Sequence, residues 1–231
     1  MDKELSQWDK GKVLLVDKPV GWTSFDVVNK IRFAIKTKKV GHAGTLDPLA
    51  TGLLIICTGK FTKRIEEFMG APKEYTGTIT LGKTTPSYDA ETEPDAIFPT
   101  DHLTEALLLE NTKQFIGNIQ QLPPMYSAIK VDGKRLYEHA RKGREIEVQP
   151  RSVEITKFEL SRIAIPEVDF IVQCSKGTYI RSLAYDFGKA VNAGGYLSSL
   201  RRTAIGEHKI TDALPLEQLL KLIQSGVEFP D

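Results

Sequence analysis

Residues 40–59 read Val-Gly-His-Ala-Gly-Thr-Leu-Asp-Pro-Leu-Ala-Thr-Gly-Leu-Leu-Ile-Ile-Cys-Thr-Gly, and Asp47 is the one formal charge among them. Charged residues make up 26% of the 231-residue chain, so a solitary carboxylate in this apolar segment stands out. Pro48 fixes the backbone directly after the acid, and the run Leu53–Ile56 is typical of a buried strand. An Asp held in this way can attack an electrophile or accept a proton.

Spacing alone leaves a second interpretation of Asp47 open. An Asp followed by Pro is also the common start of a helix, with the acid as N-cap and Pro48 at the first helical position. The two interpretations differ in chemistry, because a cap needs only a hydrogen-bond acceptor whereas catalysis needs an ionised carboxylate.

The string Gly-His-Ala-Gly-Thr-Leu-Asp-Pro-Leu-Ala-Thr-Gly-Leu-Leu, residues 41–54, resembles the active-site motif of the TruB family of tRNA pseudouridine synthases. Other segments resemble motifs of the same family, in the same order along nearly the whole chain. They are Leu15–Ser24 (entry motif K-P-x-G-x-T-S), Lys73–Gly77 with Leu81-Gly82 (tyrosine motif), Met125–Lys130 through Gly133–Tyr137 (RNA-gripping thumb), Cys174–Arg181 and Leu200–Arg202.

The resemblance implies an α+β fold with a mixed, largely antiparallel sheet of the pseudouridine synthase type, flanking helices and a thumb insertion. It implies one catalytic domain over residues 1–231, with the RNA-binding thumb at about 123–150. The irregular mixing of strand-like and helix-like segments, without a repeating βαβ rhythm, also predicts an α+β fold. Too little chain follows the last predicted helix for the C-terminal PUA domain of many relatives, so we expect a short form.

The resemblance further implies isomerisation of uridine to pseudouridine in the T-arm loop of tRNA, at position 55, on a flipped-out nucleotide. Asp47 would act as nucleophile at C1′ or as base at C2′, and the sequence does not choose between them. Catalytic roles would fall to Asp47, Tyr75 and Arg181, and substrate contacts to His42, Tyr75, Tyr179, Leu200, Lys130 and Arg135.

Several of these residues also have plainer interpretations. Tyr75 would pack in the sheet on structural grounds alone, but by resemblance it stacks on the target uracil, and Leu200 would otherwise be core. Arg181 lies in the first turn of a predicted helix and would keep Asp47 ionised if it faced that carboxylate. The four His residues show no metal-ligand spacing, and the chemistry is neither redox nor hydrolytic, so we expect neither metal nor cofactor.

The net charge of +1 conceals a segregated distribution. Residues 1–64 carry a net +6 and residues 113–151 a net +4, whereas residues 65–112 carry −8 and residues 152–231 carry −1. If the two basic segments shared a face, that face would suit the phosphates of RNA. The partner expected is therefore tRNA, through its T-arm stem-loop, bound by a monomer without an obligate protein partner.

The sequence contains no apolar run near the roughly 20 residues that cross a bilayer and no signal-like start, which predicts a cytoplasmic protein without a membrane segment. Cys57 and Cys174 lie in apolar runs and are expected to be core residues. The string Gly77–Thr84 satisfies the P-loop pattern, but its middle residues favour a strand and Pro86 follows, so nucleotide-triphosphate binding is not expected.

Local patterns predict the main elements. Strands are expected at 12–17, 52–57, 75–81, 153–162 and 168–174, and another after Gly194-Gly195 to about residue 205. Helices are expected from Thr23, with a capping box, and near 60–68, 135–142, 179–191 and 216–224. A hairpin with its turn at Asp132-Gly133 is expected before the basic helix, and the acidic stretch Pro86–Asp101 is expected as a surface loop.

Two other classes of protein remain open. A glycoside hydrolase also places an Asp beside a sugar, but it normally needs a second catalytic carboxylate. A non-catalytic RNA-binding protein would bind RNA without changing it. One departure from the family pattern T-D-T-x-D-A-x-G occurs at Thr85-Pro-Ser-Tyr-Asp-Ala-Glu-Thr92, which puts the shape of that loop in question.

Overall fold

The computed structural model describes residues 6–127, 129–131, 133–144 and 146–229. The chain forms two compact units, unit 1 with Met1–Tyr75 and Leu200–Asp231, and unit 2 with Thr76–Ser199. Strands β4 (Lys73–Leu81) and β12 (Gly195–Ile205) each continue from one unit into the other. The single catalytic domain expected from the sequence stays a prediction.

In unit 1, the sheet follows the order β14-β1-β3-β12, with β2 on β3 and β13 on β12. The pairs β1–β3, β2–β3 and β12–β13 are antiparallel, whereas β1–β14 and β3–β12 are parallel. The strands are β1 (Val13–Lys18), β2 (Val40–His42), β3 (Thr51–Thr58), β13 (His208–Lys209) and β14 (Leu214–Pro215).

Strand β3 is buried from Gly52 to Thr58 because apolar clusters cover both of its faces. Leu54 and Ile56 pack in a cluster with residues of α2 (Ser24–Ile35) and α7 (Leu216–Gln224). The alternate residues Leu53, Ile55 and Cys57 pack in a second cluster. This continuous burial explains the unbroken apolar run in the sequence and gives the preceding loop a rigid base.

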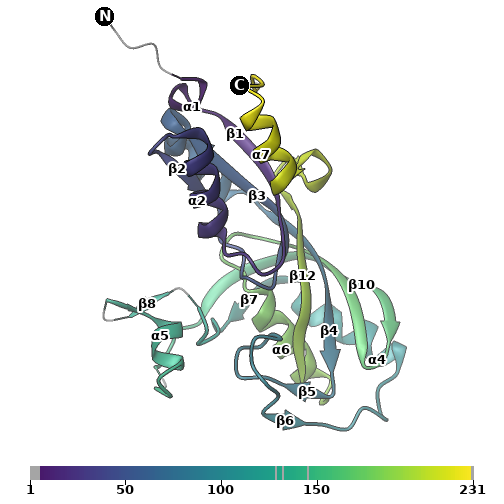
Figure 1. Cartoon of the computed structure of the whole chain (residues 1–231). Coiled ribbons are helices and arrows are strands. Elements are labelled where there is room, and N and C mark those ends of the chain that lie inside the picture. The colour runs from purple at the N-terminus through teal and green to yellow at the C-terminus, as the bar shows by residue number, and fades with distance from the viewer. Residues whose placement is uncertain (1–5, 128, 132, 145, 230–231) are drawn as a thin grey trace, which may run out of the picture. The chain divides into compact units, whose positions relative to one another are not determined.

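Helices α2 and α7 of unit 1 lie side by side (Figure 1). Helix α2 begins as predicted: the Thr23 hydroxyl accepts a hydrogen bond from the Asp26 amide, and the Asp26 carboxylate accepts one from the Thr23 amide. The remaining helices of this unit are α1 (Gln7–Lys10), the 3₁₀ helices η1 (Gly59–Arg64) and η3 (Ile210–Asp212), and α3 (Ile65–Gly70).

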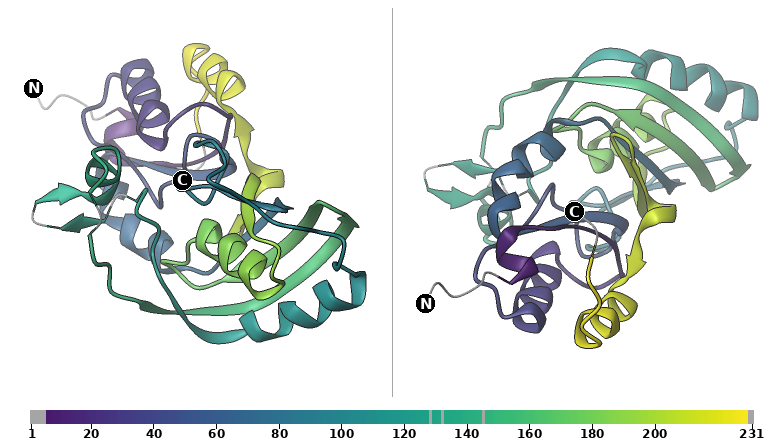
Figure 2. Two further views of the ribbon diagram at one scale, coloured as in Figure 1. Left: turned by 90° about the horizontal axis from the view of Figure 1, so that it is seen from below. Right: turned by 90° about the horizontal axis from the view of Figure 1, so that it is seen from above.

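In unit 2, the sheet follows the order β12-β4-β11-β10-β7, with antiparallel β10–β11 and β7–β10 pairs. Figure 2 shows α4 alongside the long strand β10. Phe115, Phe158, Phe170 and Phe187 form an edge-to-face aromatic core. The elements are β5 (Lys83–Thr84), β6 (Ala96–Ile97), α4 (Glu105–Thr112), η2 (Lys113–Phe115), β7 (Gly117–Gln121), β10 (Arg151–Ala164), β11 (Glu167–Cys174) and α6 (Ile180–Ala190).

The predicted thumb hairpin is present as strands β8 (Lys130–Val131) and β9 (Lys134–Arg135), followed by helix α5 (Leu136–Ala140). Asp132 of its predicted turn lies outside the described residues. The P-loop pattern is not a phosphate loop, because most of it lies in β4 and β5. Both cysteines are buried and free, as expected.

The structure rules out one of the two interpretations of Asp47 and corrects one expected loop. Asp47 caps no helix: residues 47–50 form a turn in which the Ala50 amide donates to the Asp47 carbonyl at 3.1 Å. The stretch Pro86–Asp101 is only partly a surface loop, since Ser87 and Asp89 are buried. Buried partners in unit 2 hold the first part of that stretch in the interior, as described below. The mixed and largely antiparallel sheet is as predicted.

Candidate active site

The loop that carries Asp47 connects two antiparallel strands of unit 1, β2 and β3. Its turn is anchored from α2, where the buried Ser24 hydroxyl accepts a hydrogen bond from the Leu46 amide (2.8 Å) and donates one to the Leu46 carbonyl (3.1 Å). Immediately before α2, the Gly21 amide donates to the Pro48 carbonyl at 2.8 Å. Asp47 itself is half-buried in this anchored turn.

Lys18 is fully buried at the end of β1, beside this turn. Its ammonium group donates to the carbonyls of Trp22 (2.6 Å), Pro19 (2.9 Å) and Pro48 (3.4 Å). Burial lowers the pKa of Lys18 to about 8, an effect that the negative charge of Asp47 partly offsets. Lys18 therefore ties the residue directly after Asp47 to the end of β1.

Arg202 is a second buried cation, on β12, with 1% of its surface exposed. Its guanidinium donates to the carbonyls of Leu53 (2.7 Å) and Gly44 (3.1 Å). Strand β12 approaches so closely that a Cβ on Gly52, whose φ is +101°, would lie 2.3 Å from the Arg202 carbonyl oxygen. Lys18 and Arg202 thus hold main-chain oxygens on both sides of Asp47.

Three other predicted site residues also lie in unit 1. His42 ends β2, and its pKa is lowered, first by burial and then by the positive charge of Arg202. Tyr75 is buried in β4, as the sheet-packing interpretation expects of its position. Leu200 is half-buried in β12, and its carbonyl accepts a hydrogen bond from Thr51 at 3.4 Å.

Arg181 belongs to unit 2, at the first turn of α6, and 5% of it is exposed. Its Nε lies 3.6 Å from Oδ2 of the buried Asp89, and its Nη1 donates to the Ser87 carbonyl at 3.3 Å. The other oxygen of Asp89 accepts from the Ser87 hydroxyl (2.6 Å) and the Glu91 amide (2.9 Å). This network gives the atypical loop a fixed shape.

Tyr179 directly precedes α6, and the Arg151 guanidinium lies 4.5 Å from the centre of its ring. The Gln121 side-chain amide binds the main chain of Tyr179 twice. It accepts a hydrogen bond from the Tyr179 amide (2.7 Å) and donates one to the Tyr179 carbonyl (3.0 Å). In the thumb, Lys130 of β8 and Arg135 of β9 are opposite each other in the strand register of the hairpin. The Arg135 side chain is exposed and lies beside the Tyr137 ring.

The structure therefore places the predicted residues in two groups. His42, Asp47, Tyr75 and Leu200 belong to unit 1, whereas Lys130, Arg135, Tyr179 and Arg181 belong to unit 2. The expected pairing of Arg181 with Asp47 joins the two units and stays a prediction.

Sequence reasoning gave no role to Lys18, Arg202 or Asp89. Lys18 and Arg202 did lie in motifs similar to those of the family, but a buried cation and an exposed one look alike in a sequence.

The pKa of Lys18 leads to a prediction about pH. Turnover should fall as the pH rises through about 8, because Lys18 then loses the charge that fixes the Asp47 turn. In Lys18→Arg this decline should move to higher pH, and in Lys18→Met turnover should be low throughout without the decline. The measurement is the single-turnover rate from pH 6 to 10 at saturating RNA. The same decline in wild type and both variants would assign it to another group.

The lowered pKa of Lys18 also makes the stability of the protein depend on pH in a defined direction. Below pH 8 the ammonium of Lys18 is charged in both the folded and the unfolded chain, and its burial opposes folding. Between about pH 8 and the usual lysine pKa of about 10.4, only the unfolded chain keeps this proton, so this group's contribution to stability rises with pH.

Comparison with known proteins identifies the chain's relatives. Residues 32–180 match the TruB family pseudouridylate synthase (N terminal domain). The chain is 59% identical to the tRNA pseudouridine synthase B of Flavobacterium johnsoniae, over 90% of this chain and 93% of that protein. It is 51% identical to the protein of the same name from Bacteroides fragilis, over 96% and 98% of the two chains.

Two solved structures have a fold similar to that of this chain. A chain in a Cbf5-Nop10-Gar1 complex matches with a TM-score of 0.72 and 29% identity over 95% of this chain. A chain in an H/ACA RNP bound to a substrate RNA containing 2′-deoxyuridine matches with a TM-score of 0.71 and 27% identity over 96% of this chain. This chain spans 57% of the length of each of those two chains.

The fold and the relatives define the class first: this is an isomerase of the pseudouridine synthase type, which sets aside a hydrolase or a non-catalytic RNA-binding protein. Within that class, the chain belongs to the TruB family of pseudouridylate synthases. None of the helices within the described residues has the length and apolar content that crossing a bilayer requires.

Proposed function

We propose that the protein converts uridine to pseudouridine in tRNA, in the T-arm loop at position 55, with Asp47 as the reacting carboxylate. The tRNA substrate is supported by the name that the full-length bacterial relatives share. The observation that carries the role of Asp47 is its turn, which α2 and the buried cations Lys18 and Arg202 hold from both sides. A cytoplasmic location, as expected from the sequence, accords with a tRNA substrate.

The reaction breaks the N1–C1′ bond of uridine, turns the uracil and joins C5 to C1′. The proton on C5 leaves and N1 gains a proton, so no oxidant, reductant or water is consumed. Asp47 attacks C1′ or takes the proton from C2′, and the geometry accords with either role. In both cases the carboxylate must be ionised and rigid, which is what two buried cations beside its turn favour.

The other site residues take supporting roles. We expect Tyr75 and Leu200 to offer an apolar surface to the detached base, and Tyr179 to contact the same base. Arg181, which pairs with Asp89, is the cation that we expect to keep the Asp47 carboxylate ionised. His42 occupies the space that the flipped nucleotide leaves, and its lowered pKa keeps the imidazole neutral there.

RNA binding falls to the thumb and to the basic N-terminal segment. Extruding a nucleotide from a folded T-arm loop costs a few kcal/mol, and phosphate contacts from the thumb cations Lys130 and Arg135 offset that cost. The protein acts as a monomer without a metal or an organic cofactor.

The decisive experiment maps pseudouridine in RNA incubated with the purified protein. Carbodiimide mapping and mass spectrometry should find one new pseudouridine in unmodified tRNA, at position 55, and the same product in an isolated T-arm hairpin. Modification at another uridine would overturn the T-arm assignment. A tRNA left unmodified by a folded protein that still binds it would overturn the proposed function itself.

A further inference from the structure

The outer face of α2 carries two aromatic side chains where an amphipathic helix normally presents polar ones. Its inner side is apolar and buried, as the core of unit 1 requires. On the outer side, however, Phe25 is 59% exposed and Phe33 is 85% exposed. We call this surface the α2 aromatic face; its members are Phe25, Asp26, Asn29, Lys30 and Phe33. Exposed rings of this size indicate a binding surface.

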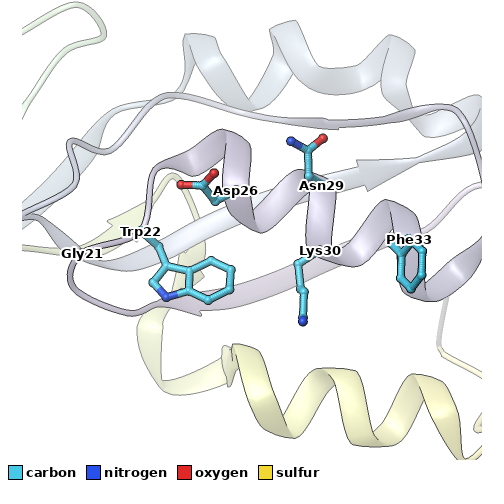
Figure 3. A pocket seen from close by; sticks show the side chains of 6 residues that line it. All are labelled: Gly21, Trp22, Asp26, Asn29, Lys30 and Phe33. Atoms are coloured by element: carbon cyan, nitrogen blue, oxygen red, sulfur yellow. The ribbon is translucent and has the colours of Figure 1, made fainter.

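A hollow of about 510 Å³ opens on this face. Figure 3 shows the Trp22 ring at one end and the Phe33 ring at the other, with Asn29 and Lys30 between them. The exposed Asn29 side chain accepts from Arg32 at 2.7 Å through its oxygen and carries an amide nitrogen that can donate. The hollow therefore offers flat aromatic surfaces, a hydrogen-bond donor and a cation along about three turns of chain.

The hollow begins at the catalytic loop. Gly21, which lines it, donates from its amide to the Pro48 carbonyl at 2.8 Å, and Ser24 at the start of α2 holds Leu46. From Ser24 to Phe33 the helix rises by about 14 Å. A ligand segment in the hollow would thus lie a short distance along unit 1 from the residue that reacts.

Toward the C-terminal end of α2, the charged residues next to the α2 aromatic face are all basic. Residues 30–39 contain five Lys or Arg residues and no Asp or Glu. Of these, Lys30, Lys36, Lys38 and Lys39 are exposed. Asp26, the acidic member of the face, is occupied by the capping box of α2.

We propose that the α2 aromatic face binds a segment of the RNA substrate, with a base stacked on Phe33 and phosphates on Lys30 and the cations that follow. The proposal rests on the proposed function for the identity of the polymer. Aromatic rings interleaved with cations are the usual combination for nucleic acid, because bases stack and phosphates pair with Lys. The core of a protein interface is instead depleted of Lys, so this charge favours RNA over a protein partner.

The test measures dissociation constants for a T-arm hairpin and for full-length tRNA over a range of salt concentrations. Phe33→Ala should weaken binding of at least one RNA by about 5- to 150-fold, because each stacked base contributes that much affinity. The slope of log affinity against log salt should not change, because no phosphate contact is lost. Lys30→Ala with Lys36→Ala should instead lower that slope by roughly 0.7–0.9 per residue.

A matched control is Ile97→Ala, which removes another highly exposed apolar side chain, from β6 of unit 2, and should leave both affinities unchanged. Phe33 is exposed, so its variant should unfold at the wild-type temperature. Ultraviolet cross-linking and mass spectrometry of the wild-type complex should place a nucleotide on the tryptic peptide that contains Phe33.

The outcomes separate this proposal from the proposed function. If wild type modifies tRNA but Phe33→Ala binds both RNAs with wild-type affinity, the α2 aromatic face is not an RNA surface. If wild-type protein self-associates and Phe33→Ala does not, the face is an interface between copies and the proposal is wrong. If wild type binds tRNA through this face without modifying it, the proposed function fails and the RNA surface stands.

Discussion

Asp47→Asn is expected to abolish pseudouridine formation while the protein still folds and binds tRNA. The amide has nearly the volume of the carboxylate but can neither attack C1′ nor accept a proton, so the single-turnover rate should fall by about 10³-fold or more. The turn itself should persist, because it is closed by the main-chain oxygen of residue 47, which Asn retains. The measurement is pseudouridine formed under single-turnover conditions, together with RNA affinity and thermal stability.

Asp212→Asn is the matched control, since Asp212 is an exposed carboxylate in the same unit and should tolerate the change without loss of rate. A folded, RNA-binding Asp47→Asn protein that works at a near-native rate would end the assignment of Asp47 as the reacting group. A variant that fails to fold would show that the carboxylate is needed for the turn as well as the main-chain hydrogen bond.

The elements that the sequence predicted well are those fixed by local chemistry. The Thr23–Asp26 capping box places the start of α2 correctly, because both hydrogen bonds form within one turn of chain. Helix α7 has the predicted bounds, Leu216–Gln224, since its apolar stripe recurs at the helical period. Strand β3 could be predicted because burial on both faces requires an unbroken apolar run in the sequence. The position of this strand also placed the loop of Asp47 directly before it.

What the sequence could not predict depends on residues far apart in the chain. Ser87 and Asp89 looked like part of an acidic surface loop, and they are buried because Arg181, about ninety residues later, pairs with them. Arg202 donates hydrogen bonds to the carbonyls of Gly44 and Leu53, although it lies about 150 residues later in the chain. Helix α4 was missed because its apolar side chains are not concentrated on one face.

The ion pair between Arg181 and Asp89 carries the second large expected effect. Both side chains are almost fully buried, so removing either one leaves an uncompensated charge inside unit 2. Arg181→Met and Asp89→Leu should therefore each lower the free energy of unfolding by about 3–5 kcal/mol. Arg181→Met should also reduce turnover by orders of magnitude, whereas Arg181→Lys should recover part of it, because a point charge replaces a planar guanidinium.

The double variant Arg181→Met with Asp89→Leu separates folding from catalysis. With neither charge of the pair left, its loss in the free energy of unfolding should be smaller than the sum of the two single losses, by about 1–3 kcal/mol. Its turnover should nevertheless remain as low as that of Arg181→Met, because the proposed cation facing Asp47 is still missing. Urea unfolding and single-turnover rates on all four proteins give the complete cycle. If turnover returned together with stability, Arg181 would serve the fold of unit 2 alone, and another group would have to keep Asp47 ionised.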